Sequence, residues 1–147
     1  MREIITLKTY IPGIIEAASS YAARGSSTSH LTEVVKHMQL AWYFWTDAAQ
    51  ITADAMRGKG DIVEALDVEP TAKRAPAMTS PVDFISYLKS NINELKKLAT
   101  KVYEDLAYPS LMPRRAIVYL EQGLIHAITA SYYINIIVEE YERTGRV

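Results

Sequence analysis

The chain has 147 residues, no cysteine and a formal net charge of −1, and 22% of its residues are charged. This length fits a single domain, residues 1–147, that can bury a core without disulfides or a structural metal. The absence of cysteine excludes a disulfide framework, a zinc finger and a thiol nucleophile, and the balanced charge argues against nucleic-acid binding. Because neither a signal peptide nor an apolar run typical of a membrane span is evident in the sequence, we expect a soluble, cytoplasmic protein.

The first predicted helix covers about residues 7–23, and Gly25 follows its end, as is typical of a residue that closes a helix. Pro12 lies inside this range and has no backbone N–H to donate. We therefore expect this helix to start late or to kink at Pro12.

The second predicted helix begins after the hydroxyl side chains of residues 26–29, which are good N-caps, and continues to Met56. Apolar residues repeat along it at helical spacing: Leu31, Val34, Val35, Met38, Trp42, Trp45 and Ala49. Residues 61–78 are irregular, with room for one short helix at 61–66. This connection is too long for a tight turn, so we expect either an ordered crossover or a mobile lid.

The third predicted helix has the clearest start. Ser80 is its N-cap, Pro81 takes the first helical position and Asp83 completes an acidic capping box. It continues to about Asp105, with these residues facing inward: Phe84, Leu88, Ile92, Leu95, Leu98 and Val102. The fourth predicted helix covers about residues 113–143 and ends at Gly145.

Four long amphipathic segments without a strand pattern predict an all-α four-helix bundle. Short connections would give an up-down-up-down arrangement. The longer connection at 61–78 favours a crossover between the second and third helices instead.

Two stretches of the chain resemble the DinB-like family of helical bundles. In residues 29–45 a serine-led helix carries His37, followed within two turns by aromatic residues, as in the second helix of that family. The last long helix carries His126, which matches the first histidine of the family's His-x-x-x-His motif. The resemblance extends to the length of the chain and the order of its helices.

The rest of the fourth-helix motif differs. The family has a second histidine and then a basic residue, glycine and glutamine, whereas this chain has Ala130, Ser131, Tyr132 and Tyr133. In DinB-like proteins three histidines hold a divalent ion with open coordination positions, and members include metal-dependent hydrolases and thiol transferases. The resemblance therefore implies metal ligands at His37 and His126 but leaves the third ligand missing.

Glu33 stands one turn before His37 and is the candidate replacement for that ligand. Two imidazoles and one carboxylate would hold zinc, nickel or iron, and the alternative is a weakly bound metal or none. A structural interpretation stands beside this one, because a half-buried histidine bonded to a neighbour is commoner than a metal ligand. The two histidines lie at similar depths in their helices, so we expect them to approach if these helices run parallel.

The residues beside His126 also allow a small pocket in place of a metal: Tyr119, Gln122, Ala130 and Tyr133. Aromatic side chains on the helix flanks predict a homodimer formed by helix-on-helix packing: Tyr43, Phe44, Tyr132 and Tyr133.

The sequence favours a non-catalytic module that binds a small molecule or associates with itself. The alternative is a metal-dependent hydrolase or thiol transferase that uses Glu33, His37 and His126, in which the ion lowers the pKa of a bound water. Paired Glu-x-x-His motifs, phosphate-binding loops and nucleophile elbows are absent from the sequence, which argues against those classes of enzyme.

Overall fold

The computed structural model describes residues 2–24, 29–56, 80–105 and 113–147. Almost all of them belong to four helices: α1 (Arg2–Ala23), α2 (His30–Met56), α4 (Pro81–Asp105) and α5 (Arg114–Thr144). No strand occurs in these ranges, which confirms the all-α four-helix bundle. Gly25, the connection at 61–78 and its short helix at 61–66 lie outside the described residues.

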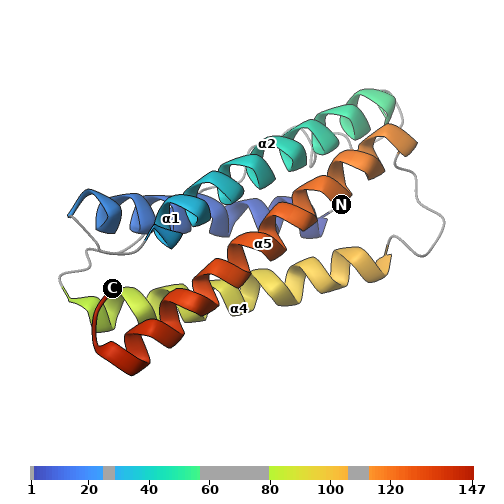
Figure 1. Ribbon diagram of the computed structural model, residues 1–147. Helices are drawn as coiled ribbons and strands as arrows, with labels where there is room; N and C mark the ends of the chain where they lie inside the picture. Colours follow the sequence, from blue (N-terminus) through green and yellow to red (C-terminus); the bar gives the residue numbers. More distant parts are fainter. Residues whose placement is uncertain (1, 25–28, 57–79, 106–112) are drawn as a thin grey trace.

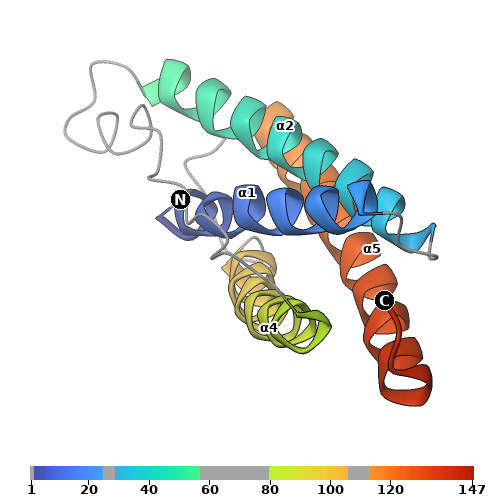
Figure 2. The same ribbon diagram turned by 90° about the vertical axis from the view of Figure 1, so that its left-hand side faces the viewer.

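The four helices form a ring in which each packs on two others (Figure 1, Figure 2). α1 and α5 both contact α2 and α4, and the most extensive interface is that between α2 and α5. Packed neighbours run antiparallel, whereas α2 and α4 run in the same direction (Figure 1). This order agrees with the predicted crossover and not with an up-down-up-down bundle.

The predicted ends of α4 and α5 are confirmed. The N–H of Asp83 donates to Ser80 Oγ at 3.3 Å, as expected for a capping serine. Gly145 closes α5 with a left-handed φ of 71°, and its N–H donates to the Tyr141 carbonyl at 2.7 Å. Only glycine adopts this conformation without strain.

The expected late start of the first helix is wrong, because α1 is continuous from Arg2 through Pro12. Ile11 and Ile14 on either side of the proline are fully buried. Their packing offsets the hydrogen bond that Pro12 cannot donate, since tertiary contacts supply most of a helix's stability in a folded domain.

The core follows the predicted periodicity. Nine of the predicted inward positions are buried: Leu31, Val34, Met38, Trp45, Ala49, Phe84, Leu88, Ile92 and Leu95. Val35, Trp42 and Leu98 are partly buried and pack against the core. Among the side chains that the structure describes, Trp45 is the largest that is fully buried.

Trp45 sets how closely α2 and α5 approach. Its indole Nε1–H donates to the Leu120 carbonyl of α5 at 3.2 Å. The ring occupies the space beside Gly123, where an added Cβ would lie only 2.5 Å from Trp45 Cδ1. Glycine at 123 therefore permits the close contact that brings the side chains of the two helices together along their seam.

Candidate functional site

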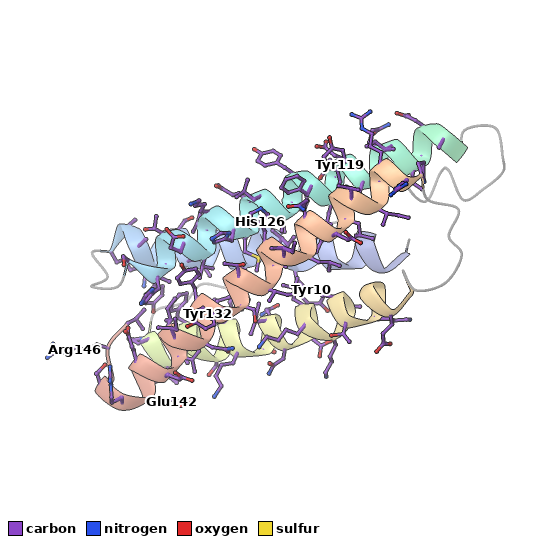
Figure 3. The ribbon with its side chains drawn as sticks, turned by 45° about the vertical axis from the view of Figure 1, so that its right-hand side comes forward. Tyr10, Tyr119, His126, Tyr132, Glu142 and Arg146 are labelled. Atoms are coloured by element: carbon purple, nitrogen blue, oxygen red, sulfur yellow. The ribbon has the colours of Figure 1, made fainter. Side chains whose placement is uncertain are left out.

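A column of aromatic and imidazole rings follows the seam between α2 and α5, and we call it the ring column. Each helix contributes three rings at seven-residue spacing: His30, His37 and Phe44 from α2, and Tyr119, His126 and Tyr133 from α5. The rings alternate between the helices, and successive centroids are 5.3 to 6.0 Å apart. Tyr119 and His126 follow one another along this seam (Figure 3). All three histidines of the chain belong to the column.

The ring column requires α2 and α5 to run antiparallel, since residue numbers rise along one helix as they fall along the other. His37 and His126 therefore meet between antiparallel helices, and the expectation that they would need parallel helices is wrong. The two histidines meet although the helices run in opposite directions, because α2 and α5 do not start at the same level along the bundle. The last turns of α5 reach the start of α2, where Glu140 lies 4.0 Å from His30.

His37 and His126 are joined directly by a hydrogen bond between their Nδ1 atoms, which are 3.0 Å apart. Their ring centroids are 5.3 Å apart. The distance between the two Nδ1 atoms, plus the distance from each ring centre to its own Nδ1, adds up to this value. Both nitrogens therefore lie on the line that joins the two ring centres. The rings therefore meet edge to edge in a linear hydrogen bond, and their lone pairs do not converge on a common point beside them.

Glu33 contacts the opposite edge of His37, with Oε2 3.5 Å from Nε2. This carboxylate favours a proton on Nε2 of His37, because an ionised carboxylate can only accept. Nδ1 of His37 is then the acceptor, and Nδ1–H of His126 donates to it. Glu33, His37 and His126 thus form a carboxylate–imidazole–imidazole chain that leaves a lone pair on Nε2 of His126.

The pKa of His126 is lowered from its usual range, first by burial and then by the charges of His37 and Lys36. His126 is therefore neutral near pH 7. The arrangement presents a neutral, oriented imidazole in the base form, flanked by the parallel ring of Phe44 at a centroid distance of 5.6 Å.

The proposed metal ligands do not surround one point. Glu33 and His126 contact opposite edges of the His37 ring, so an ion at one edge is out of reach of the other partner. Across the described residues, no three or more His, Asp or Glu side chains are grouped so that they could hold a metal ion. In this geometry Glu33 and His126 approach different nitrogens of the His37 ring, without the converging ligand atoms of a three-ligand metal centre.

The residues predicted to line a pocket beside His126 have different surroundings. Tyr119 and Tyr133 lie in the ring column, packed against Phe44 and His37. Gln122 is exposed, whereas Ala130 is fully buried in the core. The position of the family's second histidine is therefore an interior packing position in this chain.

Sequence reasoning missed two members of the ring column, His30 and Phe44. The signal was present as a repeat of seven residues in both helices, the spacing at which side chains return to the same helix face after two turns. Phe44 was instead expected at a subunit interface.

The fold and the seam define an all-α four-helix bundle with a hydrogen-bonded histidine pair between two antiparallel helices. Comparison of the chain with protein families, curated proteins and solved structures finds no significant match. The resemblance to DinB-like proteins therefore stays a prediction. Among the helices described, none is both long and apolar enough to span a membrane.

Proposed function

We propose that this protein is a metal-free module that works by self-association, with α5 pairing antiparallel with α5 of a second copy. The observation that carries this proposal is an apolar stripe of exposed residues along α5. Its large apolar members are Val118, Ile125, Ile128 and Tyr132, which are 49 to 64% exposed.

The stripe has the spacing of a coiled-coil seam. Alternating steps of three and four residues connect eight exposed positions: Arg114, Val118, Glu121, Ile125, Ile128, Tyr132, Asn135 and Glu139. This 3.5-residue period keeps one face of a helix against a partner helix. The apolar part, from Val118 to Tyr132, extends over about 21 Å at 1.5 Å per residue.

The charges at the ends of α5 support the antiparallel direction. The first turn holds Arg114 and Arg115 with no acidic residue, a sign that the helix dipole disfavours there. The last two turns hold glutamates together with Arg143, and one of them, Glu142, pairs with Lys89 at 3.3 Å. An antiparallel copy would bring Arg114 of one α5 to Glu139 of the other, and so offset the mismatch at the first turn.

One register pairs the two isoleucines of the stripe and the charged residues at its ends, with Val118 facing Asn135. With a two-fold axis near the middle of α5, Ile125 faces Ile128 of the second copy. Glu121 then faces Tyr132, and Arg114 faces Glu139 at each end of the interface. Such an isologous pairing closes as a dimer and leaves no free copy of the stripe.

Of the four aromatic residues first expected at a dimer interface, only Tyr132 belongs to this stripe. Phe44 and Tyr133 are occupied in the ring column. Tyr43 is 66% exposed but borders a hollow of about 290 Å³ between α1 and α2, alongside Pro12. The proposed interface therefore includes only one of the four aromatic residues expected from the sequence, and Ile125 and Ile128 lie at its centre.

The test is sedimentation equilibrium on Ile125→Glu, with Val82→Glu as the matched control. Both variants replace an exposed aliphatic side chain by a carboxylate, at 53% and 58% exposure, but Val82 lies on α4 outside the stripe. We expect Ile125→Glu to be monomeric near 16.5 kDa and Val82→Glu to dimerise like the parent. Equal association of all three proteins would contradict the proposal.

The alternative function is a metal-dependent hydrolase or thiol transferase at Glu33, His37 and His126. What favours it is the proximity of these three side chains. It would require the His37 ring to turn so that its ligand atoms face a common point. Metal analysis of untagged protein after dialysis distinguishes the two, since one zinc, nickel or iron per chain would support the alternative.

A further inference from the structure

An apolar groove of about 550 Å³ lies between α4 and α5, away from the ring column. Its walls are mostly aliphatic, with Leu95 and Ala99 on α4 and Leu124, Ala127 and Ile128 on α5. A groove of this size is in the range of small-molecule sites, whose walls are usually apolar with a few polar groups. Both walls include a small side chain, Ala99 on α4 and Ala127 on α5.

The polar groups of the groove are few. Thr100 and Ser131 contribute hydroxyls, and Ser131 is buried at 4% exposure. Lys96 lines the groove and is exposed to solvent. Its neighbour Lys97 pairs with Glu94 at 3.4 Å, whereas no acidic side chain among the described residues pairs with Lys96. The groove therefore combines an apolar interior with one uncompensated positive charge.

We propose that this groove binds a free alkyl-chain carboxylate, with the chain along the aliphatic walls and the carboxylate beside Lys96. The apolar walls recover the hydrophobic contribution of the methylene groups. The ammonium of Lys96 complements the single negative charge and remains partly in water, so neither charge is fully desolvated. A long-tailed monoanion satisfies both features, whereas a polar metabolite would leave the aliphatic walls without a partner.

The inference does not depend on the proposed dimer, although Ile128 belongs to both the groove and the stripe. The titrations are therefore run on the parent and on Ile125→Glu, whose substitution lies outside the groove lining. Binding by Ile125→Glu would show that the site is complete in one chain. Loss of dimerisation with retained binding would separate the two proposals.

The probes are octanoate, decanoate and 1-octanol, titrated calorimetrically below their micelle concentrations. We expect decanoate to bind roughly tenfold more tightly than octanoate, because two more methylenes are buried. We expect Lys96→Gln to weaken octanoate binding about threefold and to leave octanol unchanged, as for a solvent-exposed ion pair. Lys97→Gln is the matched control and should bind both probes as the parent does.

Ala99→Leu fills the groove and is the second test. It should abolish decanoate binding while its melting temperature stays at or above that of the parent, which shows that the fold is retained. The proposal is overturned if decanoate does not bind the parent, if Ala99→Leu binds it equally well, or if Lys96→Gln and Lys97→Gln behave alike.

Discussion

Gly123→Ala tests whether the close approach of Trp45 holds α2 and α5 together. In an exposed helix this substitution would stabilise by about 1 kcal/mol, because alanine has the higher helix propensity. Here the new Cβ would lie 2.5 Å from Trp45 Cδ1, 3.0 Å from Cε2 and closer still to Nε1. These atoms belong to a rigid ring with no exposed surface, so the ring cannot move aside without shifting a helix.

The expected cost has two parts. Overpacking of a filled core costs about 1 to 3 kcal/mol. Displacing the indole also breaks its 3.2 Å hydrogen bond to the Leu120 carbonyl, and a buried N–H without a partner costs about 1 to 3 kcal/mol. After the gain in helix propensity, we expect a net loss near 3 kcal/mol, or about 6 to 12 °C in melting temperature for a domain of this size.

The assay is urea unfolding followed by circular dichroism, on Gly123→Ala, Trp45→Ala and the double variant. Alanine at position 45 removes the three ring atoms that meet the new Cβ, so the double variant should be more stable than the sum of the single effects predicts. Strictly additive losses, or stabilisation by Gly123→Ala alone, would refute the reasoning.

Three further predictions concern the histidine pair, the core and a helix start. Because the pKa of His126 is lowered in the folded state, the unfolded chain binds the proton of this residue more tightly. The contribution of His126 to stability is therefore complete above about pH 6.5 and is lost as the pH falls through the lower pKa of the folded state. In urea titrations His126→Gln should lose less stability than the parent between pH 7.5 and 5, and equal losses in the two proteins would contradict this. Ala130→His forces a ring into a fully buried position and should lower the free energy of unfolding by about 1 to 3 kcal/mol. Added zinc should not raise the melting temperature of this variant, whereas a zinc-dependent rise would place residue 130 at a metal site. Ser80→Ala removes the acceptor for the Asp83 N–H and should cost about 1 kcal/mol, whereas Ser86→Ala, in the exposed second turn of α4, should be neutral within about 0.5 kcal/mol.

The fold could be predicted from the sequence because local signals agree with one another. The Ser80 cap, the Gly145 terminator and the apolar period of α2 each specify a helix without reference to the rest of the chain. Pro12 is the exception, and there tertiary burial of Ile11 and Ile14 overrides a local helix breaker. That burial depends on helices distant in sequence, so no local pattern revealed it.

The candidate site was only partly predictable, since it depends on how two helices align. Glu33, His37 and His126 were identified by residue type, and the structure brings each into contact with its neighbour. Which edges of the rings meet is set by the stagger of α2 against α5, which Trp45 and Gly123 determine. The hydrogen-bonded geometry, and with it the misfit to a metal, follows from that stagger and not from sequence spacing.

The groove was not predictable for a related reason. Alanine at 99 and 127 suits any buried helix contact, and only the packing of α4 against α5 shows that the two leave space between them. The same residues in a closer pair of helices would have been ordinary core.

The most direct test of the central claim is charge reversal at the ends of α5. In the antiparallel register Arg114 of one copy faces Glu139 of the other, so Arg114→Glu and Glu139→Arg should each weaken the dimer. The double variant, which restores opposite charges across the interface, should recover it. Sedimentation equilibrium at low ionic strength should therefore give twice the 16.5 kDa of one chain for the parent and the double variant, with a lower average mass for each single variant. A monomeric parent, or a double variant weaker than both single variants, would contradict the antiparallel pairing of α5.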